Sequence, residues 1–411
     1  MREFLGIIIL IVLVWLHYKS VEESPLNFFY IPSFVLKLIT GVGVGVIYAY
    51  YYSGGDTWNY FNQAKILSEV GFSNASNFIA LFIKSNYDFV EGFAYVNQPR
   101  AAFMVKLVAI INLFSNSSYW ITSLYFSFFS FIGIYKFSAW LATKFKYGKV
   151  AALALFVWPG FVFWSSGILK ETLAVGLIFW IIPTFFEIQQ TKSVKKVVVV
   201  FLGLYVLFLI KYYFAVVLIV TLLLYSISLA IKLDKKSPLQ QILIWLLMGA
   251  IGFVLGGFLH PNLRVENIVG VIIENNKAFS SISSPQSLIA FREADKDWVW
   301  VLINSPKAVF SSLFLPLNLF SGRIFQVLAS AENWIILLLT IRGLLLVNRQ
   351  NFKTNLMLVL AAVSYVMALA IFLALSTPNL GTLARYKVAF MPIVLVLVFL
   401  ANKFSYFVSK K

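Results

Sequence analysis

A single carboxylate stands in the sequence YYSGGDTWNYF, residues 51–61, directly after a long apolar run. Asp56 follows the glycine pair Gly54 and Gly55. Because glycine adopts backbone conformations closed to other residues, the pair predicts a sharp turn at the end of a membrane segment. A carboxylate at that boundary is placed to act as a general base toward a hydroxyl or amine. The competing interpretation is structural, because Asp is also a favoured N-cap residue at the start of a helix.

A second acid, Glu171, follows Lys170 in the sequence WPGFVFWSSGILKE, residues 158–171. The Ser-Ser-Gly step at 165–167 predicts a helix break, after which the lysine and the acid open the next apolar run. One interpretation is functional: Lys170 binds a phosphate, and Glu171 is a second acidic group that faces Asp56. The alternative is a boundary pair whose lysine extends along the helix toward water.

Further cations stand on the side of the membrane where topology does not require them. Arg385 and Lys387 flank Tyr386 in the sequence LARYKV. Arginine suits phosphate because its planar guanidinium binds two oxygens at once. Arg323, in NLFSGRIF, and Arg100, in NQPRAAF, are candidates for the same role. The structural alternative is that these residues only anchor helices at the membrane interface.

The composition places these residues in a membrane protein. Hydrophobic residues make up 61% of the 411 residues and charged residues 12%, whereas soluble domains contain about 25% charged residues. The net charge of +17 does not predict a nucleic-acid partner, because most lysines stand in short loops between apolar runs, as the positive-inside rule requires. The absence of cysteine excludes disulfides, thiolate catalysis and Cys-ligated metals. The two histidines, His17 and His260, are too scattered for a metal site.

Long apolar runs predict the membrane spans, since one crossing needs about 20 residues. These runs cover residues 3–17, 33–52, 119–143, 150–166, 172–188, 196–210, 212–231, 240–258, 331–348, 355–376 and 388–403. Two interrupted runs, 100–115 and 306–321, predict either spans or helices that lie at the interface. The sequence therefore predicts an all-α polytopic membrane protein with about 11–13 transmembrane helices.

Basic residues in short loops fix the orientation of the spans. The basic loops are KFKYGK (144–149), TKSVKK (191–196), KLDKKS (232–237), NRQNFK (348–353) and the tail KFSYFVSKK. We assign them to the cytoplasm, which leaves the N-terminus and the segments 53–118, 166–171, 259–330 and 377–387 on the outer side. The segment 53–118 has helical apolar spacing in TWNYFNQAKILSEV and NASNFIALFIKS. This spacing predicts amphipathic helices beside the membrane.

This topology divides the chain into four regions. They are an extra N-terminal membrane segment and linker (1–32), a catalytic membrane module (33–258), an outer region with interfacial helices (259–330) and C-terminal membrane helices (331–411). Besides Asp56 and Glu171, the outer side receives further acids at Glu332 and in the cluster Glu293, Asp295 and Asp297.

The order of these parts resembles the glycosyltransferase C superfamily, which includes protein O-mannosyltransferases and aminoarabinose transferases. In these integral-membrane enzymes a span leads to a long outer loop with an essential Asp. An interfacial segment, a span, a basic inner loop and a Pro-ended span before a second outer acid follow. The matching parts here are GGDTWNY with Asp56, NQPRAAFMVKLVAIINLFSNSSYW, KFKYGK and WPGFVFWSSGILKE with Glu171, and the later ARYKVAFMP is similar to the superfamily's Arg-Tyr-then-Pro ending. The sequence departs from the pattern in having one Asp where an acidic pair is common, and NQPR in place of His-Pro-Pro.

The resemblance implies transfer of a sugar from a polyprenyl-phosphate donor to a lipid, glycan or protein acceptor. Asp56 would be the base, and Lys170, Arg100, Arg323, Arg385 and Lys387 would bind the donor phosphate. Trp58, Tyr60, Trp164 and Tyr386 would contact the sugar or the isoprenoid. A divalent ion held by Asp56 and Glu171 would be Mg or Mn, since both ligands are carboxylates. We expect a bacterial inner membrane, with the active site on its outer face and membrane lipids as neighbours.

Two other functions compete with this one. An O-antigen-type polysaccharide polymerase or ligase would share the many spans and large outer loops, and would depend on Arg323 and Arg385 while Asp56 served only as a helix cap. A transporter would place charges in the middle of its spans and carry two related halves. The sequence shows few charges near span centres, chiefly Lys37, Lys106, Lys136 and Arg342, and no evident inverted repeat.

Overall fold

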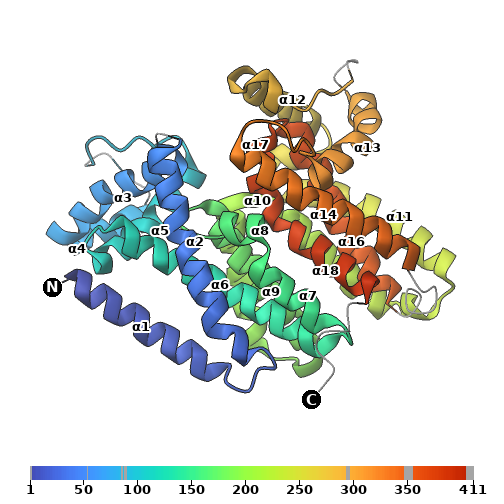
Figure 1. Cartoon of the computed structure of the whole chain (residues 1–411), viewed down its shortest axis with the longest axis horizontal. Coiled ribbons are helices and arrows are strands. Elements are labelled where there is room, and N and C mark those ends of the chain that lie inside the picture. The colour runs from blue at the N-terminus through green and yellow to red at the C-terminus, as the bar shows by residue number, and fades with distance from the viewer. Residues whose placement is uncertain are drawn as a thin grey trace. The chain divides into compact units, whose positions relative to one another are not determined.

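The computed structural model of the chain is shown in Figure 1. It describes residues 2–52, 54–84, 87, 90–292, 297–346 and 355–403. The predicted basic loop 348–353, nearly all of the tail, and the acids Glu293 and Asp295 lie outside this part of the chain. The described residues form helices and connecting turns, and they belong to two compact units, Met1–Lys211 and Tyr212–Lys411. The prediction of an all-α polytopic membrane protein is confirmed.

Eight helices in the described residues are long and apolar enough to cross a membrane, and a bent pair of helices raises this number to nine. Two features account for the difference from the predicted runs. The runs 196–210 and 212–231 share the label α10 (Val194–Ala230), in which two helices meet at a kink where Lys211 has non-helical backbone angles. The run 150–166 is divided into α7 (Gly148–Val157) and α8 (Pro159–Trp164), because Trp158 adopts an extended conformation before the proline.

The first unit is built around α6. Besides α7, α8 and the first part of α10, the unit contains α1 (Arg2–Ser20), α2 (Tyr30–Tyr50), α3 (Asp56–Ser73), α4 (Ala75–Lys84), α5 (Pro99–Ser115), α6 (Tyr119–Lys144) and α9 (Lys170–Thr191). Helix α6 packs against α2, α7 and, most extensively, α9. A Cβ atom added to Gly133 of α6 would lie 1.9 Å from the carbonyl oxygen of Gly176 in α9. The two backbones are therefore in direct contact, as small residues allow between membrane helices.

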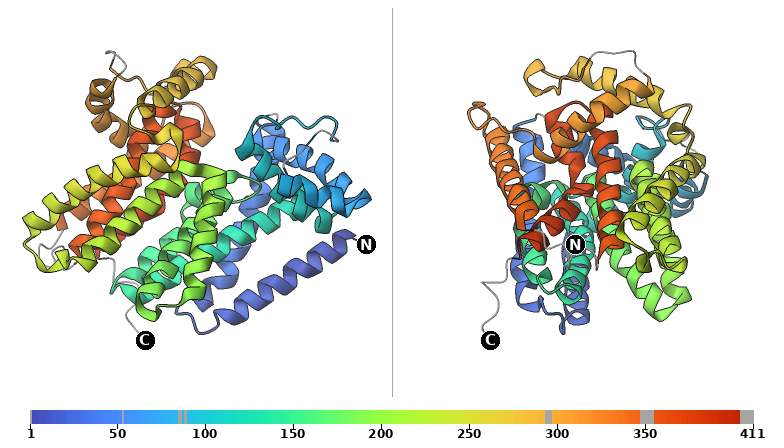
Figure 2. Two further views of the ribbon diagram at one scale, coloured as in Figure 1. Left: turned by 180° about the vertical axis from the view of Figure 1, so that it is seen from behind. Right: turned by 90° about the vertical axis from the view of Figure 1, so that its right-hand side faces the viewer.

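The first helix runs parallel to α6 along the edge of this unit (Figures 1 and 2). Near its start, the Gly6 carbonyl accepts a hydrogen bond of 2.6 Å from the Tyr125 hydroxyl of α6. Near its end, His17 is hydrogen bonded to Tyr30, at the start of α2, over 2.8 Å. The start of the chain thus lies at the same end of the unit as the predicted outer segment 53–118, as the topology derived from the basic loops requires.

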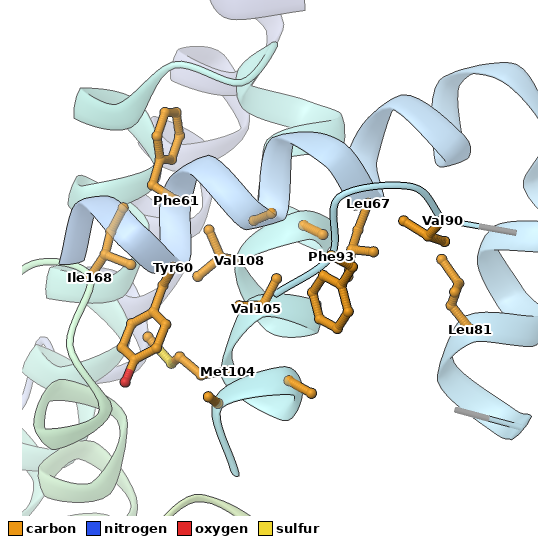
Figure 3. Packing of buried hydrophobic residues seen from close by; sticks show 14 of the residues in the cluster. Tyr60, Phe61, Leu67, Leu81, Val90, Phe93, Met104, Val105, Val108 and Ile168 are labelled. Carbon is orange, nitrogen blue, oxygen red and sulfur yellow. The ribbon is translucent and has the colours of Figure 1, made fainter. Parts of the chain in front are cut away.

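The hydrophobic core of the segment 53–118 lies mainly between α3, α4 and α5 and extends to residues of α6 and α9 (Figure 3). Tyr60 and Leu67 of α3 face Met104 and Val105 of α5, and all four are at most 5% exposed. Burial of such side chains contributes about 1.5–3 kcal/mol each. The predicted helices in this segment are therefore present, and they are packed against one another.

The second unit contains seven named α-helices besides the end of α10. They are α11 (Pro238–Gly256), α12 (Ile268–Ile282), α13 (Trp298–Phe314), α14 (Ile324–Leu346), α16 (Leu356–Ser376), α17 (Leu380–Tyr386) and α18 (Met391–Asn402). Helices α12 and α13 pack against α16, and α14 packs against α18 (Figure 2). The predicted outer acid Asp297 is the N-cap of α13, since its carboxylate accepts a hydrogen bond from the Trp300 backbone N–H over 3.0 Å. Asp297 therefore has a structural role of the kind that N-cap residues supply.

Candidate functional site

Five of the residues predicted to carry chemistry converge at one end of the first unit. Lys170 lies within electrostatic range of Asp56, Glu171 and Arg100. Its ammonium also lies 5.0 Å from the ring centroid of Tyr60. The four charged residues come from the first turns of α3, α5 and α9, three helices whose N-terminal ends carry partial positive charge. The arrangement brings two carboxylates and two cations together at the place where three helices begin.

Asp56 is positioned by the predicted glycine turn. Gly54 and Gly55 have φ values of 120° and 117°, which only glycine adopts readily. A Cβ at Gly55 would also lie 2.9 Å from the Tyr48 ring. Gly55 holds the N-cap position of α3, and Asp56 is the first residue of the helix itself. The Asp56 side chain is partly buried. The structural interpretation of Asp56 as the N-cap is therefore not the arrangement seen here.

Tyr95 is a neighbour of Asp56 that the sequence did not point to. Burial, and then the charge of the Asp56 carboxylate, raise the pKa of the Tyr95 phenol above its ordinary value. Its ring centroid lies 5.8 Å from that of Tyr60. The phenol therefore stays protonated at neutral pH and supplies an O–H group close to Asp56.

Glu171 is paired with Lys211 rather than with Lys170, unlike the boundary pair that was one of the two interpretations the sequence left open. The Lys211 ammonium lies 2.7 Å from a Glu171 carboxylate oxygen, and the two side chains are 6% and 1% exposed. Lys211 has φ −147° and ψ 80°, so the helical backbone of α10 is interrupted at the residue that makes this ion pair. The pair thus joins the start of α9 to the kink of α10.

The predicted metal site does not fit these neighbours. A carboxylate of Glu171 that is neutralised by an ammonium at 2.7 Å is a poor ligand for a divalent cation. Among the residues that the structure describes, no group of three or more His, Cys, Asp or Glu side chains is placed to hold a metal. The positive charges available at this site come from Lys170 and Arg100.

Three of the four aromatic residues predicted to contact a sugar or isoprenoid, Trp58, Tyr60 and Trp164, belong to the first unit and pack against other parts of the protein. Trp58 stacks on Tyr119, with ring centroids 3.9 Å apart, and its indole N–H donates to the Gly45 carbonyl over 3.0 Å. Tyr60 is 5% exposed. Trp164 packs edge-on against Tyr48, at 6.5 Å between centroids. These contacts use the flat faces or edges that a sugar would otherwise occupy.

Replacing Trp58 by alanine should therefore lower the free energy of unfolding, by about 3 kcal/mol. The lost terms are the stack on Tyr119 and the hydrogen bond to Gly45. Denaturant titration of the detergent-solubilised protein measures the change. Trp15→Ala is the matched control, because Trp15 is 56% exposed on α1 and should cost little. Unchanged stability together with a raised donor KM would instead make Trp58 a sugar contact.

Tyr51 and Tyr52 differ from these packed aromatic residues. They directly follow α2, next to the glycine turn, and are 53% and 49% exposed. Their ring centroids lie 5.0 Å apart in an edge-to-face arrangement. About half of each side chain is accessible, so these two residues close to Asp56 in the sequence have surface for contact with a ligand.

The remaining predicted cations belong to the second unit. The Arg385 guanidinium lies 5.3 Å from the Tyr386 ring centroid. Lys387 donates to Asn333 over 2.8 Å and lies within electrostatic range of Glu332. Arg323 is exposed just before α14. Lys387 is therefore held by the protein itself, whereas Arg323 has the solvent access that a ligand contact needs.

The site thus consists of Asp56, the two cations Lys170 and Arg100, the Tyr95 phenol and the buried Glu171–Lys211 pair. The role of Lys211 could not be predicted from the sequence, because a single lysine between two apolar runs is typical of the boundary between two spans. Its sequence signal is a charge far inside α10, whose other lysines, Lys195 and Lys196, stand at the start of the helix. No family model, curated protein or solved structure matches this chain significantly, so the arrangement of its own side chains carries the functional argument.

Proposed function

We propose that this chain is a membrane glycosyltransferase that moves a sugar from a polyprenyl-phosphate-linked donor to a lipid, glycan or protein acceptor. The observation that carries the proposal is the meeting of Asp56 with Lys170 and Arg100 at the start of three helices. Cations and helix N-termini together favour a bound phosphate. A carboxylate in the same place is suited to deprotonate the acceptor.

The reaction follows from these roles. The acceptor hydroxyl or amine attacks the anomeric carbon of the sugar, and the bond from that carbon to the phosphate oxygen breaks. Asp56 takes the proton that the acceptor loses. Lys170 and Arg100 stabilise the charge that develops on the departing polyprenyl phosphate. The isoprenoid tail remains in the lipid, and the exposed rings of Tyr51 and Tyr52 supply surfaces for the sugar.

The location of the site supports a reaction on the non-cytoplasmic face. Helices α6 and α9 run parallel, since Gly133 meets Gly176 and Lys136 further on meets Thr184. The basic loops 144–149 and 191–196 that follow them therefore lie at the end opposite to Lys170. The positive-inside rule assigns that opposite end to the cytoplasm. A bacterial inner membrane with the site facing outward is the corresponding proposal for localisation.

Replacing Lys170 by methionine tests the phosphate-binding role. The variant should raise the KM for the donor by about 10- to 100-fold, because a hydrogen bond to a charged group contributes about 1.5–3 kcal/mol. The measurement is release of polyprenyl phosphate from polyprenyl-phosphate sugars, with purified protein in lipid vesicles. Lys65→Met is the control, since Lys65 is exposed further along α3 and should leave KM unchanged.

The same assay distinguishes the rival functions. A polysaccharide polymerase or ligase would keep its activity in Lys170→Met but lose polymer formation in Arg385→Ala or Arg323→Ala. A transporter would move a labelled substrate across the vesicle membrane without releasing any polyprenyl phosphate. Release by the unmodified protein that is weakened by Lys170→Met and unaffected by Arg323→Ala supports the glycosyltransferase.

A further inference from the structure

Lys37 is a charged residue in the membrane-spanning helix α2 that the reaction above does not use. Its side chain is 3% exposed, so the surrounding protein encloses it. The salt bridges among the described residues do not include it. A buried charge inside a membrane is costly and usually marks a functional site.

The Lys37 ammonium binds the end of α8. It donates to the backbone carbonyl and to the hydroxyl of Ser165. The Val162 carbonyl lies 3.5 Å from the same nitrogen. An ammonium has three donors and no acceptor, so one side chain satisfies several acceptors where α8 ends and the chain turns toward α9.

The residues after Ser165 are held from three further directions. The Gly167 N–H donates to Ser127 of α6 over 3.0 Å. The Thr40 and Ser166 hydroxyls are 3.0 Å apart, and Thr172 of α9 donates to the Ser166 carbonyl over 2.9 Å. Polar groups from α2, α6 and α9 thus fix the short connection between α8 and α9.

The connection between α8 and α9 determines the position of Lys170, which begins α9. Gly167 has φ 73°, and a Cβ there would lie 3.2 Å from the Gly41 carbonyl oxygen. Ile168 and Leu169 are fully buried, so the two residues before Lys170 have little room to rotate. The backbone that Lys37 holds therefore leads directly to the first turn of α9.

We propose that Lys37 is a positioning residue for Lys170. Its ammonium fixes the break between α8 and α9, and the break in turn fixes the direction of the Lys170 side chain toward the donor phosphate. The role in donor binding rests on the proposed function, but the effect on the direction of residue 170 does not.

A double-mutant cycle tests the link to donor binding. Lys37→Met should raise the donor KM by about tenfold, and Lys37→Met combined with Lys170→Met should be no worse than Lys170→Met alone, because coupled residues are non-additive. Lys37→Arg should recover part of the loss. Lys136→Met is the matched control, since Lys136 also lies in a span and Glu187 would keep its ion pair with Lys196. An unchanged KM, or a double variant with additive losses, overturns the proposal.

A second measurement needs no enzymatic activity. The chain has no cysteine, so Lys170→Cys introduces a single thiol whose labelling rate by a water-soluble reagent reports its direction. Adding Lys37→Met should change that rate by about fivefold or more, as expected for coupled neighbours, whereas adding Lys136→Met should not. If Lys37→Met fails to fold, Ser165→Ala removes one acceptor and should change the rate in the same direction. An equal rate in both backgrounds overturns the positioning role. If the labelling rate changes but the unmodified protein releases no polyprenyl phosphate, the positioning role stands and the proposed function is rejected.

Discussion

Replacing Asp56 by asparagine should lower the rate of polyprenyl-phosphate release by about two to four orders of magnitude. Asparagine keeps the size of the side chain but cannot accept the acceptor's proton. The donor KM should change little, because Lys170 and Arg100 remain in place. Steady-state release measured in lipid vesicles over a range of donor concentrations separates the two parameters.

Glu69→Gln provides the control for this experiment. Glu69 is an exposed acid on the same helix, α3, so its loss should not alter the rate. An acid in the first turn also stabilises a helix by about 0.3–1 kcal/mol, and unfolding curves should show that this small term is all that Asp56→Asn loses in stability. If Asp56→Asn retains full activity while Arg385→Ala abolishes polymer formation in cells, Asp56 is structural and the polymerase function replaces ours.

Replacing Glu171 by glutamine should destabilise the protein by about 3–5 kcal/mol. The change leaves the ammonium of Lys211, whose side chain is 6% exposed, without its counter-charge in a buried environment. Lys211→Met should have a comparable effect, because it leaves the carboxylate of Glu171 buried without the ammonium. Denaturant titration in detergent micelles measures the free energy of unfolding of each variant.

The double variant Glu171→Gln/Lys211→Met distinguishes pairing from separate roles. Removing both charges should recover most of the stability that either single change loses, since two neutral groups of similar shape have no uncompensated charge. If the losses of the two single variants simply add, the two residues stabilise the fold independently. Activity of a well-folded double variant would further show that Glu171 only positions the start of α9.

The spans could be predicted from the sequence because their apolar runs are long and bounded by basic loops. The glycine turn before Asp56 could also be predicted, because glycine is the residue that adopts positive φ most readily. Gly54 and Gly55 both have positive φ in the structure. The turn also explains why Asp56 falls at the start of a helix. These features depend on residues that are close together along the chain.

The partners of buried charges could not be predicted in this way. Glu171 pairs with Lys211 rather than with its neighbour Lys170, and Lys37 binds a helix end 128 residues away. Trp58 faces Tyr119 rather than an open site. In each case tertiary packing selects the partner, and no spacing pattern in the sequence identifies it.

The contact between Gly133 and Gly176 limits how the helices that carry the site can move. Since the backbones of α6 and α9 touch there, α9 cannot slide along α6 or rotate against it without a collision. Lys170 and Glu171 therefore stand at the start of a helix that is fixed against α6. Trp58 of α3 is likewise stacked on Tyr119 of α6, so the helix starts that carry Asp56 and Lys170 are both anchored to α6.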